Sequence, residues 1–131
     1  MTKPLSSSIE DYLEVLLALA DPNGAVRVTD VASRLGVAKS SVSEAMSLLK
    51  ERGFVTQEKY GRIFLTEIGT EEARAVRRRH VILLTFLRDV LGVDPEKAEQ
   101  DACQMEHAVG TESMQRMVAF LEKTLAHQIK D

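Results

Sequence analysis

Residues 28–55 read VTDVASRLGVAKSSVSEAMSLLKERGFV, and this stretch decides the fold. Apolar side chains recur at helical spacing on both sides of Gly36, which is suited to a tight turn between two helices. Thr29 and Asp30 are predicted to cap the first helix, and Gly53 is predicted to end the second in a left-handed conformation. Two short helices joined by a glycine turn predict a helix-turn-helix. The predicted core residues of this pair are Val31, Ala32, Leu35, Val42, Met46 and Leu49.

A predicted β-hairpin follows the second helix. Residues 54–58 and 62–65 favour strands, and a polar turn at 59–61 separates them. A hairpin in this place is the wing of a winged helix-turn-helix domain. The sequence LTEIG at 65–69 is common to many winged-helix regulators and supports the same fold.

Helices are predicted for most of the remaining chain. Only 5% of the residues are aromatic and Trp is absent, so the core must be aliphatic. The expected fold class is mainly α with a small β-hairpin wing. We expect a winged helix-turn-helix DNA-binding domain at 1–70 and a helical metal-binding and dimerisation domain at 71–131. Apolar residues at helical spacing predict helices at 6–20, from about Glu71 to Gly92, from Asp94 to near Gly110, and from Thr111 onward.

Positive charge is concentrated in the predicted winged domain. The chain carries a net charge of −3, but seven basic and four acidic residues between Arg27 and Arg62 give that stretch +3 and leave −6 for the rest. A recognition helix presents small polar and basic side chains to the major groove from its first turns. The sequence therefore predicts binding to double-stranded DNA. The predicted contacts of the recognition helix and the wing are Lys39, Ser40, Ser41, Ser43, Glu44, Lys59, Tyr60 and Arg62.

Several classes of protein are disfavoured by the sequence. A single Cys excludes an internal disulfide, and no apolar run has membrane-spanning length. No leader follows Met1, so we expect a cytoplasmic protein without a membrane partner. An H-E-x-x-H helix, a Gly-rich phosphate loop and a recognisable Ser-His-Asp set are all absent from the sequence, which argues against a zinc hydrolase and other enzymes. We therefore expect neither catalysis nor a small-molecule substrate.

The motif ACQMEH at 102–107 contains candidate metal ligands. It places Cys103, Glu106 and His107 at i, i+3 and i+4, which is one face of a helix. A thiolate, a carboxylate and an imidazole together suit a borderline transition metal. The carboxylate favours Fe²⁺ or Mn²⁺, whereas sulfur favours Fe²⁺, Co²⁺, Ni²⁺ or Zn²⁺. By itself the motif also fits a core cysteine beside a solvated Glu-His pair.

Three further residues are candidate ligands elsewhere in the chain. Asp11 and Glu14 are spaced i, i+3 on the first predicted helix, turned away from its apolar stripe. His80 lies on the apolar side of the long predicted helix. Without a metal, Asp11 and Glu14 would be ordinary surface charges and His80 would be a histidine of the core.

Taken together, these stretches resemble the diphtheria toxin repressor and manganese transport regulator family of metal-dependent repressors. The resemblance is carried by EDYLEVLLAL at 10–19, the stretch 28–55, RRRH at 77–80 and DACQMEH at 101–107, in this order and spacing. It covers nearly the whole chain and implies a metal-activated repressor of metal-homeostasis genes that binds operator DNA. The implied primary site comprises Asp11, Cys103, Glu106 and His107, while Glu14 and His80 resemble ligands of a second ion in the manganese branch.

The chain departs from both branches of that family. Cys103 matches the iron branch, whereas the manganese branch has a glutamate at this position that can bridge two ions. Asp11 matches the manganese branch, whereas the iron branch has a methionine there. The iron branch has a second, ancillary metal site with a carboxylate and a histidine at the positions of Leu84 and Glu99. Because this chain has other residues there, the number of ions per subunit is open. The expected metal is Fe²⁺ or Mn²⁺, with Fe²⁺ slightly favoured and Co²⁺, Ni²⁺ or Zn²⁺ able to substitute. Since the sequence stops at Asp131, we expect no SH3-like domain of the kind found in the iron branch, nor any metal site that needs it.

A homodimer and a mechanism of activation are also expected. The apolar stripe from Met114 to Leu125, together with the apolar side of the long helix, exceeds what a small winged domain can cover. An ion joining the first helix to the Cys103 motif would fix one half relative to the other and set the spacing of the recognition helices. Two alternatives are a winged-helix regulator that senses oxidation at Cys103 or a small organic ligand, and an interaction module, which would leave the wing and its charge unexplained.

Overall fold

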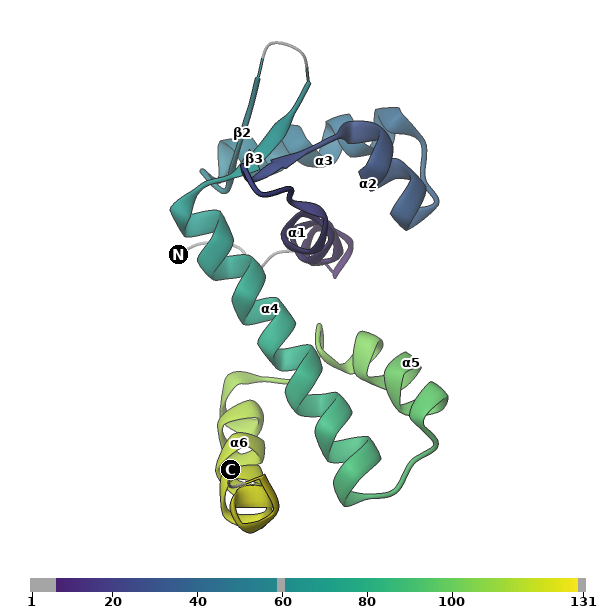
Figure 1. Ribbon diagram of the computed structural model, residues 1–131, viewed down its shortest axis with the longest axis vertical. Helices are drawn as coiled ribbons and strands as arrows, with labels where there is room; N and C mark the ends of the chain where they lie inside the picture. The colour runs from purple at the N-terminus through teal and green to yellow at the C-terminus, as the bar shows by residue number, and fades with distance from the viewer. Residues whose placement is uncertain (1–6, 59–60, 130–131) are drawn as a thin grey trace. The chain divides into compact units, whose positions relative to one another are not determined.

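The computed structural model describes residues 7–58 and 61–129 (Figure 1). It is mainly α-helical with one small antiparallel sheet, which confirms the predicted fold class. The chain divides into two compact units, residues 1–76 and 77–131, and each is described by itself. Within the described part of the chain, no helix combines the length and apolar character needed to cross a membrane.

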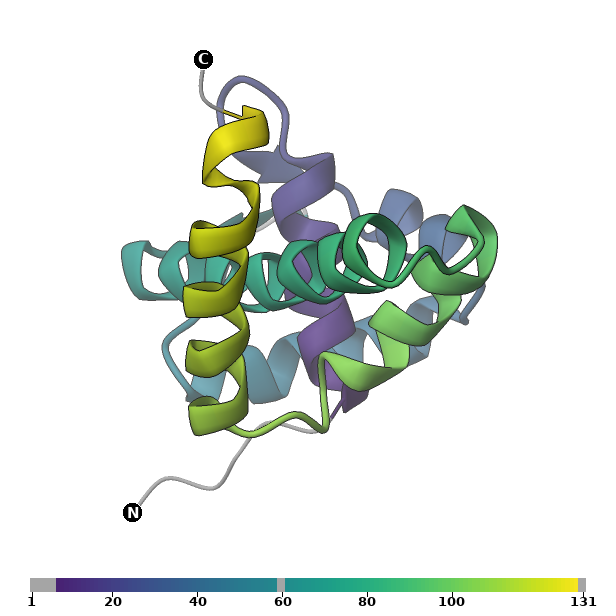
Figure 2. The same ribbon diagram turned by 90° about the horizontal axis from the view of Figure 1, so that it is seen from below.

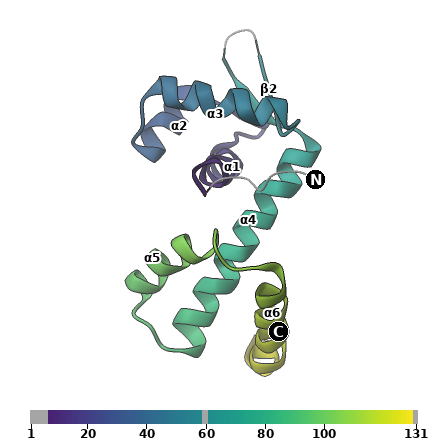
Figure 3. The same ribbon diagram turned by 180° about the vertical axis from the view of Figure 1, so that it is seen from behind.

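The N-terminal unit has the helices and the hairpin of a winged domain (Figures 1 and 3). Its sheet has the order β1-β3-β2, with Phe64 of β3 paired to Ala25 on one side and Thr56 on the other. The β2–β3 hairpin is the predicted wing. Strand β1 was not predicted, because two residues are too few to show an alternating pattern. The elements are α1 (Ser7–Leu19), β1 (Ala25–Val26), α2 (Val28–Leu35), α3 (Lys39–Glu51), β2 (Val55–Gln57) and β3 (Ile63–Leu65), followed by the start of α4 (Glu67–Thr85).

The core of this unit confirms the helix-turn-helix pattern. The apolar stripes of α2 and α3 pack with α1 around the sheet, and Leu13 and Leu16 of α1 are fully buried. Of the residues predicted to face inward, Leu35 is half-buried. The buried ones are Val31, Ala32, Val42, Met46 and Leu49.

The predicted capping of α2 was wrong. The helix begins at Val28, and Arg27 precedes it in an extended conformation without a side-chain capping bond. Thr29 and Asp30 therefore lie inside the first turn. The cause is β1, which ends at Val26 and leaves a single residue before the helix starts.

Helix α4 begins at Glu67, four residues before the predicted start. Thr66 caps it, since its Oγ1 accepts a hydrogen bond of 3.0 Å from the backbone N–H of Gly69. The same hydroxyl donates to the carbonyl of Gly53 at 2.7 Å. Gly53 has the predicted left-handed conformation, with φ at 78°. Thr66 thus joins the end of α3 to the start of α4.

The C-terminal unit is entirely helical in its described residues. α5 and α6 lie on opposite sides of the last turns of α4 (Figures 1 and 2). The Asp94 carboxylate caps α5 by accepting a hydrogen bond from the N–H of Lys97, and Pro95 occupies the first turn as predicted. The predicted long helix changes to a π-helical segment after Thr85. The elements are the end of α4, η1 (Phe86–Val90), α5 (Pro95–Met105) and α6 (Thr111–Ile129), around a core of Leu83, Leu87, Ala98, Ala102 and Met114.

Candidate metal centre and nucleic-acid interface

His80 is the centre of a cluster of ionisable side chains in the C-terminal unit. α4 supplies it, and only 5% of its surface is exposed. Its Nδ1 lies 2.7 Å from Oε1 of Glu106, and its Nε2 lies 2.9 Å from Oε2 of Glu99. A neutral imidazole has one N–H and can donate to only one of two carboxylates. Holding both contacts therefore takes one further proton, or a metal cation, between a ring nitrogen and the carboxylate that faces it.

Glu106 is a nearly inaccessible carboxylate, with 1% of its surface exposed. Helix α5 ends at Met105 and not near Gly110, so the prediction that one helix carries the whole motif was wrong. Glu106 nevertheless keeps helical angles, φ −60° and ψ −24°, and its N–H donates to the carbonyl of Ala102. Its Oε2 lies 3.5 Å from Nε2 of His107. The two carboxylate oxygens thus face two different imidazoles.

Cys103 adds a thiol to the cluster. Its Sγ lies 3.9 Å from Nδ1 of His80 and 3.9 Å from Oε2 of Glu99. The ligand atoms of these three residues all lie within 4.8 Å of one another. Bonds of about 2.0–2.3 Å to a zinc-like ion place its ligand atoms roughly 3–4 Å apart. Imidazole, thiol and carboxylate at this spacing fit a divalent transition metal.

Pairwise contacts in the C-terminal unit link four of the six predicted metal ligands: Cys103 to His80, His80 to Glu106, and Glu106 to His107. The other two lie on α1 in the N-terminal unit, where Asp11 is exposed and Glu14 is half-buried.

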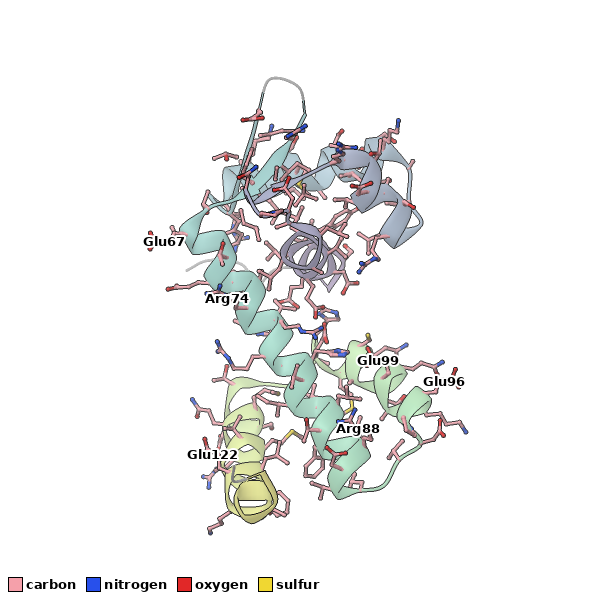
Figure 4. The ribbon with its side chains drawn as sticks, in the orientation of Figure 1. Glu67, Arg74, Arg88, Glu96, Glu99 and Glu122 are labelled. Carbon is pink, nitrogen blue, oxygen red and sulfur yellow. The ribbon has the colours of Figure 1, made fainter. Side chains whose placement is uncertain are left out.

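Glu99 was not among the predicted ligands. Its position four residues before Cys103 on the same helix was the available signal, because side chains at i and i+4 are neighbours on a helix. Glu96, one turn earlier on α5, extends away from α4 (Figure 4). It is exposed and therefore suits a matched control for Glu99.

Arg88 brings a positive charge close to the same helix. Its Nε donates a hydrogen bond of 2.9 Å to Oδ1 of Asp89. This bond lowers the pKa of the Asp89 carboxyl below its ordinary value. It also raises the pKa of Arg88, to which the charge of Glu99 contributes a smaller part. Arg88 thus balances part of the negative charge beside the cluster (Figure 4).

The predicted DNA contacts lie along the first turns of α3. The side chains of this group are exposed, while Val42 among them is fully buried in the core. Arg62 is exposed just before β3. Lys59 and Tyr60 lie outside the described residues. The exposed members of the group on α3 are Lys39, Ser40, Ser41, Ser43 and Glu44.

A surface hollow beside the wing was not predicted from the sequence. It is lined by Arg27, Val28, Thr29, Gly61 and Arg62. No pattern marked Arg27 in advance, because its relation to Arg62 depends on the pairing of β1 with β3.

A winged helix-turn-helix and a helical unit with clustered imidazole, thiol and carboxylate groups define a metal-responsive transcriptional regulator. Residues 4–63 match the N-terminal DNA-binding domain of iron-dependent repressors, and residues 66–127 match their metal-binding and dimerisation domain. The chain belongs to the iron-dependent repressor family, and it is a metal-dependent DNA-binding transcriptional regulator. The resemblance noted from the sequence motifs is thereby confirmed.

Individual relatives agree with this assignment. An uncharacterised helix-turn-helix transcriptional regulator of Methanocaldococcus jannaschii is 38% identical over 120 residues, which cover 91% of this chain and 96% of the relative. The transcriptional regulator MntR of Salmonella typhimurium is 38% identical over 115 residues, which cover 88% of this chain and 73% of that relative. A solved manganese-dependent transcriptional repressor with manganese bound has a TM-score of 0.74 at 35% identity, with coverage of 86% of this chain and 52% of that chain. The chain thus spans about half the length of that solved structure.

Proposed function

We propose that the chain is a homodimeric repressor of metal-homeostasis genes that binds operator DNA when Fe²⁺ or Mn²⁺ is present. The observation that carries this proposal is the cluster around His80, where two carboxylates face one imidazole and a thiol lies beside them. Such a set of donors is balanced by a divalent cation. The comparisons support the choice of metals, since the matching family models describe iron-dependent repressors, one solved relative is a manganese-dependent repressor, and another is ScaR with bound Zn²⁺.

The proposed metal ligands include all those inferred from the sequence. His80, Cys103, Glu106 and His107 belong to the C-terminal unit, and we add Glu99 to them. Asp11 and Glu14 of α1 are proposed to complete the ligation. A bound ion would supply the positive charge that these carboxylates need, and ligands drawn from both units would couple metal binding to DNA binding. That coupling is reciprocal, so DNA must tighten metal binding as much as metal tightens DNA binding.

The homodimer is proposed from the match to a dimerisation domain and from apolar surface on the C-terminal unit. Leu91 is 58% exposed and Phe120 is 46% exposed. Phe120 also contacts Phe86 edge to face, with ring centroids 5.9 Å apart. Large apolar side chains at the surface are typical of interfaces between subunits.

Fluorescence anisotropy with labelled promoter DNA tests the proposed function. The protein is titrated in chelator and then with Mn²⁺, Fe²⁺ under anaerobic conditions, Co²⁺ and Zn²⁺, at one fixed salt concentration because phosphate-driven affinity depends steeply on salt. We expect tight binding only with metal, strongest with Fe²⁺ or Mn²⁺. Equal affinity in chelator and in metal would refute metal-dependent repression.

Replacing Glu99 with Gln is expected to weaken Co²⁺ binding by about 10-fold, because one charged donor beside His80 and Cys103 is removed. The Co²⁺ absorption spectrum measures both affinity and coordination geometry, and the spectrum should change together with the affinity. Glu96→Gln removes the same charge from the same helix and should leave both unchanged. Identical Co²⁺ titrations for Glu99→Gln and the wild type would remove Glu99 from the ligand set.

A second candidate function is sensing of oxidation at Cys103. The observation that favours it is the exposed thiol beside the His80 imidazole. For a redox sensor, Cys103→Ser abolishes the response of DNA binding to peroxide. For the metal sensor, the same variant keeps a weakened response to Mn²⁺, because the carboxylates and imidazoles remain. Anisotropy of this variant with peroxide and with Mn²⁺ separates the two functions.

A further inference from the structure

The basic hollow of the N-terminal unit has no role in the metal centre. Its volume is about 260 Å³, and Arg27, Val28, Thr29, Gly61 and Arg62 line it. Both arginines are exposed, so their guanidinium groups are accessible to a ligand from solution.

The two arginines flank the end of one strand pair. Val26 of β1 pairs with Ile63 of β3 at the end of this antiparallel ladder, and Arg27 and Arg62 are the next residues on the two strands. Both line the same hollow, so their like charges repel each other across it. An anion between them removes that repulsion and accepts charge-assisted hydrogen bonds from both guanidinium groups.

Two neighbouring features bear on the charge of the hollow. The first turn of α2 contributes Val28 and Thr29, and the first N–H groups of a helix have no partner within the helix. Asp21 is an acidic group that interacts with Arg62, but its carboxylate already accepts hydrogen bonds from the N–H groups of Asn23 and Ala25. Asp21 is one carboxylate against two guanidinium groups, so it offsets only part of their positive charge.

We propose that this hollow binds one backbone phosphate of duplex DNA, with Arg27 and Arg62 as its cationic partners. The inference rests on the proposed function, because the hollow belongs to the same unit as the recognition helix α3. Phosphate contacts of this kind hold a protein in register on the duplex without reading the bases. Arg27 would thus contribute to affinity and not to the choice of sequence.

Anisotropy titrations of the full chain with saturating Mn²⁺ test the proposal. Wild type, Arg27→Gln and the control Arg34→Gln, which removes the same charge from exposed surface at the other end of α2, are titrated with promoter and scrambled duplexes at several salt concentrations. Log affinity decreases as log salt concentration increases. For Arg27→Gln we expect this decrease to be less steep, by about 0.9 in slope for each phosphate that the variant no longer neutralises. The drop in affinity should be equal on both duplexes, and Arg34→Gln should keep the wild-type slope.

Three outcomes would overturn the proposal: a wild-type slope for Arg27→Gln, an equal drop in affinity for Arg34→Gln, or a drop confined to the promoter duplex. If the wild type fails to bind DNA with any metal, the proposed function fails, and the hollow is then tested with inorganic phosphate. Amide shifts of Thr29 and Gly61 that follow the phosphate concentration in the wild type but not in Arg27→Gln support an anion site. Absence of these shifts in the wild type overturns it.

Discussion

Replacing Glu106 with Gln is expected to lower the affinity for Mn²⁺ or Co²⁺ by at least about 100-fold, which exceeds the usual effect of removing a residue that only orients a ligand. The substitution keeps the shape of the side chain but removes its charge. Oε1 of Glu106 faces His80 at 2.7 Å and Oε2 faces His107 at 3.5 Å, so the charge is shared between two other proposed ligands. Isothermal titration calorimetry with each metal measures the change in affinity directly.

The unfolding temperature of the Glu106→Gln protein, with and without metal, is a second and independent test of Glu106 as a metal ligand. A carboxylate with 1% of its surface exposed carries a desolvation cost that a neutral amide does not. The unfolding temperature in chelator should therefore be unchanged or higher, while the rise that metal produces in the wild type disappears. Glu112→Gln, at an exposed position of α6, should keep the wild-type metal affinity. If Glu106→Gln binds metal like the wild type, Glu106 is a structural residue and not a ligand.

Replacing Gly69 with Ala is expected to destabilise the protein by about 3 kcal/mol or more, at the upper end of the cost of overpacking a core. A Cβ on residue 69 would overlap the carbonyl oxygen of Phe54. That oxygen belongs to the backbone and accepts the N–H of Thr66, so it cannot rotate aside as a side chain would. The start of α4 or the strand after Phe54 must move instead. Urea unfolding followed by circular dichroism measures the change.

Gly110→Ala is the matched control for this substitution. Among the residues that the structure describes, and apart from its two chain neighbours, no heavy atom lies within 4 Å of a Cβ added there, and Gly110 is not among the glycines with positive φ. We expect the stability of this variant to change by at most about 0.5 kcal/mol, because the restriction of the unfolded chain by Ala offsets the lower preference for Ala just before α6. Equal unfolding midpoints for the two variants would show that the contact between Gly69 and Phe54 relaxes without cost.

Prediction of the helices succeeded where side-chain spacing alone decides the structure. The stripes of α2 and α3 predicted the buried Val42 and Met46, and the start of a helix at Asp94 was predicted correctly. These features depend on residues within a turn or two of one another. The capping of α2 was predicted wrongly, because the start of that helix depends on the distant pairing of β1 with β3.

The sequence by itself determined the winged fold and most of the metal donors of the C-terminal unit. Cys103, Glu106 and His107 lie within five consecutive residues, so they are neighbours along the chain whatever the packing of other elements. Tertiary structure alone decided the parts that join distant segments. Packing of α5 against the end of α4 sets Glu99 beside His80, and pairing of β1 with β3 brings Arg27 and Arg62 to one hollow. Local spacing does not encode such contacts, because they form only when the separate elements pack.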